Sequence, residues 1–427
     1  MTQHSTPLRF ITAGSVDDGK STLIGRLLYD SKALLTDQIK TLNAGKEKGN
    51  KEAIDFSILT DGLEAEREQG ITIDVAYRYF STAKRKFIIA DTPGHEQYTR
   101  NMVTGASTAS AAIVLIDASQ LNFDEKPLQL LPQTKRHSAI LRQLNCPHIL
   151  VAVNKMDLLD YSEEKFNAIV EAYRQLAAQL GLKEVHFVPV SALLGDNLVY
   201  ASESTPWYQG EPLLTILENL PSVDEVSHSN ADFYFPVQLV VRQDTDKADD
   251  FRGYQGRIER GSVQLGQAIR IEPNGLTAKA TEIITPKGEV TQAVAGEVIT
   301  LRLDRDIDIS RGDLFVDESS PLTPQKQLEA TICWFDERPL NTARKYLLKH
   351  STQTVFAKIS EIESVLNVHT LEQESGTTAL KMNDIARVRL SLQKPIVATT
   401  YEENIAGGAF ILVDEATYNT VAAGMIL

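Results

Sequence analysis

Apolar and polar residues are arranged in two ways along the chain, and the change occurs near residue 221. Before it, short and almost continuous apolar runs are separated by longer segments whose apolar residues follow helical spacing. Continuous apolar runs are typical of parallel strands that are buried on both faces. The runs predict strands at 10–13, 87–91, 111–117, 148–154 and 187–191.

The clearest helical segment covers residues 163–180. Its apolar residues recur at intervals of three and four, which places them on one face of a helix. Ser162 can cap the first turn, and Gly181 can end the last one. The alternation of strands and helices predicts a doubly wound α/β domain with a mostly parallel sheet. In such folds, ligands bind beyond the carboxyl ends of the strands.

After residue 221 the pattern changes to short β-rich runs punctuated by glycine and proline, which is typical of all-β domains. Polar segments at 222–231 and 319–324 resemble linkers. We therefore expect an α/β domain at 1–222, followed by β-barrel domains at 223–320 and 321–427. The predicted barrel strands lie at 235–241, 268–271, 298–303, 328–334 and 386–392.

The loop after the first predicted strand carries the first candidate chemistry. Its sequence fits the phosphate-binding pattern G-x-x-x-x-G-K-[ST], and a helix is predicted directly after it at 21–29. Such a loop aims backbone N–H groups and a helix N-terminus at one anion. Lys20 would neutralise the β- and γ-phosphates, and the Ser21 hydroxyl would reach Mg²⁺. The predicted phosphate-binding residues here are Gly14, Ser15, Val16, Asp17, Asp18, Gly19, Lys20, Ser21 and Thr22.

A second motif, Asp91-Thr-Pro-Gly94, follows the same kind of buried strand. A carboxylate at a strand end can hold Mg²⁺ through water, and the Gly94 N–H can bond a γ-phosphate. By itself this stretch describes a simple Pro-Gly turn. Its place downstream of a phosphate loop favours the nucleotide interpretation, in which the loop after Gly94 senses the γ-phosphate.

Base recognition is predicted from Asn154-Lys-Met-Asp157, at the end of another buried strand. The Asp157 carboxylate can accept hydrogen bonds from N1 and the exocyclic amine of guanine. Adenine does not offer this pair of donors, and leaving a buried carboxylate unpaired is costly. We expect Asn154 to brace the phosphate loop and the Lys155 stem to cover the base. The next strand is followed by a loop whose backbone N–H can reach guanine O6, formed by Ser191, Ala192 and Leu193.

Thr72 lies between the phosphate loop and the Asp91 motif. A threonine whose hydroxyl meets Mg²⁺ and whose N–H meets the γ-phosphate is what a nucleotide-sensing loop requires. The equal alternative is an ordinary β-branched strand residue, because threonine favours strands. The residues around Thr72 do not decide between these two interpretations.

Charge and cysteine content narrow the function classes. The net charge of −14 over 427 residues argues against broad binding to nucleic acid or to anionic membranes. The two cysteines, Cys146 and Cys333, lie in apolar surroundings, which favours buried thiols and suits a reducing cytosol. The first residues lack the apolar core of a signal peptide, and no apolar run reaches about 18 residues. We expect a cytoplasmic protein without a membrane span.

These motifs, in this order, resemble those of the translation-factor-type GTPases, and the resemblance extends over essentially the whole chain. Residues 207–214 resemble the end of that family's GTPase domain, 306–313 the close of its first barrel and 395–427 the end of its second. The resemblance implies a protein that binds GTP with Mg²⁺ and hydrolyses it, with Ser21, Thr72 and Asp91 around the metal. It also implies that His95, directly after Gly94, orients the attacking water.

Within this family the chain resembles the GTPase subunits of bacterial sulfate adenylyltransferase (ATP sulfurylase). The alternative is a tRNA-delivering elongation factor. Elongation factors typically carry His or Ser where this chain has Asp18, Arg where it has Gln69 and Glu where it has Arg136. The stretch 251–258 also departs from their pattern. No physical argument connects these positions with sulfate activation, so the assignment rests on the resemblance.

The resemblance implies that GTP hydrolysis drives the uphill synthesis of adenosine 5′-phosphosulfate from ATP and sulfate. The nucleotide motif of this chain is of the guanine type, and none of its eight histidines forms the H-x-x-H pattern typical of adenylyl transferases. Adenylyl transfer is therefore expected on a separate, smaller catalytic subunit in a hetero-oligomer. Residues 60–73 and 94–102 would be the movable elements that couple the two reactions. The sequence ends just after the second predicted barrel, so no fused adenosine-phosphosulfate kinase is expected.

Overall fold

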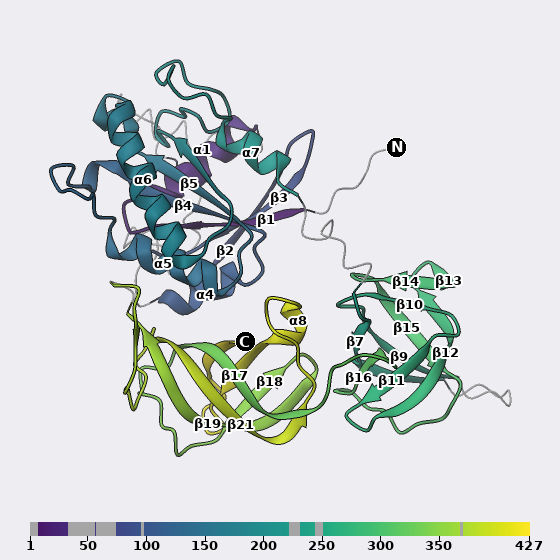
Figure 1. Cartoon of the computed structure of the whole chain (residues 1–427). Coiled ribbons are helices and arrows are strands. Elements are labelled where there is room, and N and C mark those ends of the chain that lie inside the picture. Colours follow the sequence, from purple (N-terminus) through teal and green to yellow (C-terminus); the bar gives the residue numbers. More distant parts are fainter. Residues whose placement is uncertain are drawn as a thin grey trace. The chain divides into compact units, whose positions relative to one another are not determined.

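The structure, a computed structural model, describes residues 7–32, 56, 74–94, 98–221, 231–243, 251–367 and 370–427. The chain divides into two compact units (Figure 1). The first consists of Met1–Glu225 and Asn367–Glu372, and the second of Val226–Leu366 and Gln373–Leu427. The domain boundaries expected at 222 and 320 stay predictions, and the first of them falls outside the described residues.

The first unit alternates strands and helices, as the apolar pattern predicts. Residues of the strands β4 and β5 are buried along their whole length, which explains their continuous apolar sequence. The elements are β1 (Leu8–Ala13), α1 (Lys20–Asp30), β2 (Ala76–Ser81), β3 (Lys86–Asp91), α4 (Thr99–Ala106), β4 (Ala111–Asp117), η3 (Ala118–Gln120), α5 (Pro132–Gln143), β5 (His148–Asn154), η4 (Met156–Leu159), α6 (Glu163–Leu180), β6 (Val185–Pro189) and α7 (Leu213–Asn219).

Among the described residues of this unit, the strands form one sheet in the order β2-β3-β1-β4-β5-β6. Only β2 is antiparallel to its neighbour, and the other pairs are parallel. Helices α1 and α7 pack on one face of the sheet, and α4, α5 and α6 lie on the other (Figure 1). The predicted doubly wound, mostly parallel α/β fold is confirmed.

The local sequence explains where the predicted elements begin and end. The Ser162 side chain accepts a hydrogen bond from Lys165 N at 3.3 Å, and Gly181 ends α6 with φ of 70°, as expected. Strand β2 was not predicted, because it is an edge strand in which Tyr77 and Tyr79 are exposed rather than part of an apolar run. Strand β6 ends before the predicted residue 191.

The second unit is almost entirely β, as its glycine-punctuated sequence predicts. Its elements are β7 (Tyr234–Pro236), β8 (Leu239–Gln243), β9 (Phe251–Arg257), β10 (Ser262–Gln264), β11 (Ala268–Glu272), β12 (Leu276–Thr285), β13 (Gly288–Val290), β14 (Gln292–Val294), β15 (Val298–Leu303), β16 (Leu314–Asp317), β17 (Gln325–Trp334), β18 (Tyr346–His350), β19 (Gln353–Leu366), β20 (Gln373–Glu374), β21 (Ile385–Ile396), α8 (Ile405–Gly408), β22 (Ala409–Val413) and β23 (Thr420–Ile426).

One predicted strand, 235–241, is two strands in the structure. Strand β7 pairs with β16, whereas β8 pairs with β9 at the other end of the same sheet, β7-β16-β11-β12-β15-β9-β8. The backbone changes partner between them, because Val237 N donates to Asp313 O and Gln238 N donates to Gln255 O, both at 2.8 Å. The continuous segment 234–243 thus joins both ends of the sheet.

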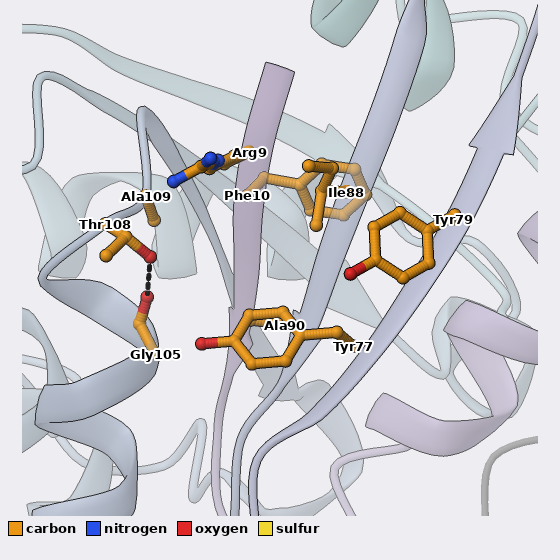
Figure 2. A pocket seen from close by; sticks show the side chains of 9 residues that line it. All are labelled: Arg9, Phe10, Tyr77, Tyr79, Ile88, Ala90, Gly105, Thr108 and Ala109. Carbon is orange, nitrogen blue, oxygen red and sulfur yellow. Dashed lines mark hydrogen bonds between the residues drawn. The ribbon is translucent and has the colours of Figure 1, made fainter. Parts of the chain in front are cut away.

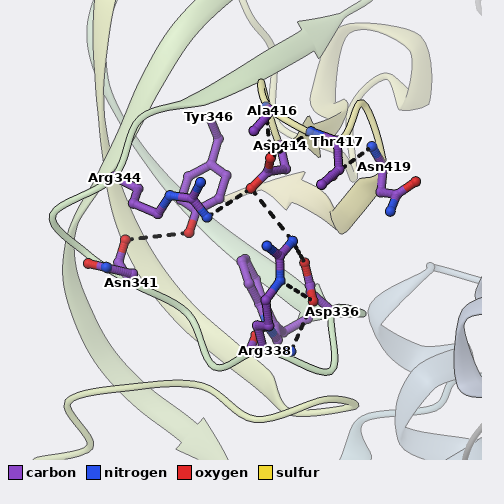
Figure 3. A network of polar contacts seen from close by, with 10 residues as sticks. Asp336, Arg338, Asn341, Arg344, Tyr346, Asp414, Ala416, Thr417 and Asn419 are labelled. Carbon is purple, nitrogen blue, oxygen red and sulfur yellow. Dashed lines mark hydrogen bonds and ion pairs between the residues drawn. The ribbon is translucent and has the colours of Figure 1, made fainter.

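The later strands form a closed barrel in the order β18-β22-β23-β17-β21-β19, which β18 closes by pairing with β19. Trp334 is 1% exposed in its core, as expected of a packing anchor, and Cys333 is also buried. A polar network holds the loops at one end (Figure 3). Asp414 accepts from Ala416 N at 2.8 Å and pairs with Arg344 at 3.0 Å.

Arg270 holds the segment between the two sheets of the second unit. Its guanidinium donates to the carbonyl oxygens of Glu318 and Ser320 at 2.9 Å and of Leu322 at 2.7 Å. The segment predicted as a linker at 319–324 therefore contains no strand but is fixed by hydrogen bonds. In neither unit does a described helix have the length and apolar character needed to cross a membrane.

Candidate functional site

The carboxyl ends of several parallel strands meet at one edge of the first unit's sheet. Strand β3 ends at Asp91, β4 at Asp117 and β5 at Asn154. The register pairs Thr12 with Asp91, and Asp117 with Asn154. Because these strands end at nearly the same level, the loops that follow them lie side by side. Residues from separate predicted motifs are thereby brought into contact.

The loop between β1 and α1 is the predicted phosphate loop. Helix α1 begins at Lys20, and Gly19 before it has φ of 92°, which favours glycine. The Lys20 Nζ donates to Gly14 O at 2.9 Å and to Ser15 O at 2.6 Å. Burial lowers the pKa of the Lys20 ammonium, and nearby aspartates, foremost Asp91, oppose that shift. The loop thus encloses a cation that its own carbonyl groups orient.

Gly94 brings the loop after β3 against the phosphate loop. A Cβ at this position would lie 2.6 Å from Gly14 O and 2.7 Å from Lys20 Nζ, so only glycine fits. The Gln133 side chain of α5 donates from Nε2 to Gly94 O at 2.9 Å. Gln133 was not among the predicted site residues, and its place in the segment 133–137 gave no physical reason to select it.

Asp91 lies in the interior beside this loop and is 2% exposed. Thr12 Oγ1 donates to Asp91 Oδ1 at 3.1 Å, and Thr92 Oγ1 donates to Thr12 O at 2.6 Å. These bonds orient the carboxylate at the end of the strand, on the side of Lys20, whose pKa it raises. A buried, oriented carboxylate and the Ser21 hydroxyl in the first turn of α1 are oxygen ligands of the kind that suits Mg²⁺.

Asn154 joins the phosphate loop to the loop after β6. Its Nδ2 donates to Asp18 O at 2.7 Å, and its Oδ1 accepts from Ala192 N at 2.9 Å. The brace expected from Asn154 to the phosphate loop is therefore present. A Cβ on Gly19 would lie 2.5 Å from Asn154 Nδ2, so this contact also requires a glycine.

Lys155 is held by an ion pair with Asp117, with 2.7 Å between Nζ and Oδ2. The Asp117 side chain is 1% exposed, so this carboxylate fixes the lysine stem from the end of β4. Asp117 is a contact that the prediction missed, although its position as the last residue of a buried strand could have indicated it. Asp157 follows in η4 and is half-buried.

The loop after β6 is fixed from several sides. Ser191 is buried, and its Oγ accepts from Leu194 N at 3.2 Å. Leu193 O accepts from Arg26 Nη1 of α1 at 2.9 Å, a contact that was not predicted. The Leu193 side chain is exposed, so this residue contributes to the site through its backbone.

Some predicted residues lie outside the described part of the chain. These are Thr72, His95 and Gln69, together with the whole segment 60–73. Of the second movable segment expected, 94–102, Thr99–Met102 form the first half of α4. The roles assigned to Thr72 and His95 therefore stay predictions.

A cavity of about 230 Å³ lies elsewhere, on the sheet face formed by β1, β2 and β3 (Figure 2). It is lined by Arg9, Tyr77, Tyr79 and Ile88, with Thr108 beside α4. None of the predicted nucleotide-site residues lines it. The cavity is therefore distinct from the edge at which the strands β3, β4 and β5 end.

Comparison with protein families places this geometry. Residues 6–226 match the family described as Elongation factor Tu GTP binding domain, and residues 327–427 match the family GTP-eEF1A C-terminal domain-like. A sulfate adenylyltransferase subunit 1 from Saccharophagus degradans is 47% identical to the chain, with 98% of the chain and 86% of the relative covered. The protein of the same name from Cellvibrio japonicus is also 47% identical, with the same shares covered.

The chain belongs to the sulfate adenylyltransferase subunit 1 family and carries its elongation-factor-type GTPase domain. The bifunctional enzyme CysN/CysC of Mycobacterium tuberculosis is 47% identical over 99% of this chain, which corresponds to 67% of that enzyme. Family membership confirms the resemblance and favours the sulfate adenylyltransferase branch over the elongation-factor alternative. A solved structure of sup35 with GMPPNP is 21% identical and covers 100% of this chain and 95% of its own, with a TM-score of 0.44, too low for any argument.

Proposed function

We propose that the protein binds GTP with Mg²⁺, hydrolyses it and uses the hydrolysis to drive adenosine 5′-phosphosulfate synthesis on a separate catalytic subunit. The observation that carries this proposal is the junction at Asn154, whose side chain bonds both the phosphate loop and the loop after β6. A single residue thereby joins a phosphate-binding loop to the loop expected at the guanine edge. The family of the chain supports the second half of the proposal.

The phosphates would be held by the loop 14–22, by Lys20 and by the N–H of Gly94. Lys20 is buried and already lies between backbone carbonyl oxygens, so its ammonium needs only a small displacement to meet an anion. Mg²⁺ would supply positive charge to the phosphate oxygens. Its proposed ligands are the hydroxyls of Ser21 and Thr72 and, through water, the carboxylate of Asp91.

Guanine would be selected by Asp157 and covered by the stem of Lys155. The ion pair between Lys155 and Asp117 supports this, because it holds the aliphatic stem in one place before a base binds. The backbone N–H groups at Ser191, Ala192 and Leu193 would approach guanine O6. One of them, Ala192 N, already donates to Asn154, so the choice of donor for O6 falls to its neighbours.

Hydrolysis would depend on His95, which follows Gly94 and would orient the attacking water. Gly94 supports this placement, because it lies against Gly14 and Lys20 and so sets where the next residue begins. The link from Gln133 to Gly94 O connects the same loop to α5. A change at the γ-phosphate could therefore be passed both to the loop after Gly94 and to a helix of the domain.

The proposed partner is a small catalytic ATP sulfurylase subunit in a hetero-oligomer, in the cytoplasm. GTP and GDP must then favour different conformations of the complex, since a nucleotide that binds both equally drives nothing. The relatives' own designation as subunit 1 supports a partner chain. The two cysteines are free and buried, which suits a reducing compartment.

The deciding experiment is co-purification of the protein with its companion from the native cell, followed by an assay of adenosine 5′-phosphosulfate formation. We expect formation to require GTP and to stop when a non-hydrolysable GTP analogue replaces it. Product formation at the same rate without GTP would refute the coupling. GTP binding without hydrolysis, with or without the partner, would indicate a scaffold. GTP-dependent retention of aminoacyl-tRNA on a filter would support the elongation-factor alternative instead.

A further inference from the structure

The phosphate loop contains a buried acidic side chain that the proposed function does not use. Asp18 is 2% exposed, and its Oδ2 accepts a hydrogen bond from Ser15 N, the second residue of the same loop. Loops of this kind bind phosphate with their backbone N–H groups. A carboxylate therefore occupies one of the donors that the loop offers to an anion.

Asp18 is fixed in this position from two sides. Its backbone oxygen accepts from Asn154 Nδ2 at 2.7 Å, which ties the residue to the guanine side of the site. A Cβ on Gly14 would lie 2.8 Å from Asp18 Oδ2, so the carboxylate fits closely against the start of the loop. The contact with Ser15 is therefore part of a packed arrangement rather than a chance approach of a surface side chain.

The other anion-binding group of the loop is satisfied in the same way. Lys20 Nζ donates to Gly14 O and Ser15 O, at 2.9 and 2.6 Å. The loop thus carries internal acceptors for both its cation and its Ser15 N–H. A phosphate that takes these donors must replace bonds that the chain already makes, and the bond to a carboxylate is the stronger kind.

We propose that the Asp18 carboxylate competes with the nucleotide phosphates for the Ser15 N–H, and so weakens nucleotide binding and speeds GDP release. This inference rests on the proposed function, because it requires GTP and GDP to bind at this loop. Asp18 is a positioning residue here, since it acts through Ser15. A GTPase that must turn over repeatedly to drive a reaction benefits from fast product release.

The charges around Asp18 set the pH range in which the competition acts. Burial raises the pKa of Asp18 to about 6, while Lys20 and Lys155 lower it and Asp117 raises it. Above pH 6 the group is charged, accepts strongly and repels a phosphate. Below pH 6 it is protonated and does neither. The competition therefore weakens as the pH falls through 6.

The first test compares GDP release from the full-length protein and from Asp18→Asn and Asp18→Ala, with a fluorescent GDP as the probe. Removing a charged hydrogen-bond competitor should slow release by about tenfold in both variants. Asp17→Asn is the matched control, because it removes the same charge from an exposed side chain of the same loop. It should slow release by less than a third as much. Equal or faster release from both Asp18 variants, with unchanged thermal unfolding, would overturn the inference.

The second test measures the ratio of the wild-type and Asp18→Asn release rates between pH 5 and 8. Titration of GDP itself cancels in this ratio. We expect the ratio to approach one below pH 6 and to reach its maximum above pH 7, whereas a purely structural effect would give a constant ratio and refute the competition. Failure of the wild-type protein to bind GDP at all would instead refute the proposed function.

Discussion

The two units of the molecule treat their charged residues in opposite ways. In the first, Asp91, Asp117 and Lys20 are buried at the carboxyl edge of a parallel sheet. In the last barrel of the second unit, the charges of β17, β19 and β21 lie on an exposed face and pair across neighbouring strands. Arg389 Nε, for example, lies 2.8 Å from Glu363, and Arg387 Nε lies 2.9 Å from the same carboxylate.

The difference follows from strand direction. Parallel strands all end at one edge, so the residues that terminate them converge, whereas antiparallel strands distribute their ends over two edges. Charges in the barrel are therefore neutralised by a neighbour on the same face. We infer that substitutions in the first unit change nucleotide chemistry, and that comparable substitutions in the second change stability at most. The following predictions test this contrast.

The largest effect is expected for His95→Ala. Loss of the residue that orients water should lower GTP hydrolysis by at least about 100-fold while GTP binding is kept, because the phosphate loop and the guanine loop are unchanged. Single-turnover hydrolysis and equilibrium binding of a non-hydrolysable analogue measure the two quantities. A normal hydrolysis rate would remove His95 from the mechanism.

Asp157→Asn should change the base preference by a factor of about 10 to 100, because the amide can no longer accept from both guanine donors. The measurement is competition between GTP, ATP and xanthosine triphosphate. GTP should lose its advantage, and xanthosine triphosphate should gain. If the variant keeps the wild-type discrimination, Asp157 does not read the base.

Gly94→Ala introduces a Cβ within 2.7 Å of Gly14 O and Lys20 Nζ, in the proposed phosphate site. GTP affinity should fall by about tenfold, since either the loop or the lysine must move. Gly266→Ala is the control: it has φ of 83° in the second unit, with no atom within 4 Å of the added Cβ. The control should lose a little stability and bind GTP normally, and equal loss of affinity in both variants would contradict the contrast.

The smallest effect is expected for Arg389→Ala. Its ion pairs with Glu361 and Glu363 are exposed, and exposed pairs contribute little. The midpoint of thermal unfolding should fall by no more than about 2 °C, with GTP hydrolysis unchanged. A clear loss of hydrolysis would show that this face of the barrel takes part in the reaction.

Prediction from the sequence was most accurate where one residue pattern had one physical meaning. Strands 111–117 and 148–154 and the helix 163–180 have the predicted bounds, because burial on both faces and amphipathic spacing each leave a distinct pattern. The strand expected at 235–241 was predicted incorrectly as one element, because a change of partner at Val237 leaves apolar residues on both sides of it. The edge strand β2 was missed for want of a continuous apolar run.

The candidate site shows the same division. The loops 14–22, 91–94, 154–157 and 191–193 could be selected from the chain because their residue types suit phosphate, metal and base. Asp117 and Gln133 could not, because an aspartate at a strand end and a glutamine in a helix have many uses. Their partners, Lys155 and Gly94, are 38 and 39 residues away in the chain.

The amino-acid sequence alone determined which chemistry the protein can carry and where each strand and helix lies, since these depend on residue type and on spacing within one segment. Only the tertiary structure decided that the carboxylate of Asp18 faces Ser15 and that Asn154 joins two loops. Such contacts depend on strand register and on the direction of side chains from distant segments, and no local pattern encodes either. They are also the contacts on which the affinity for a nucleotide is proposed to depend.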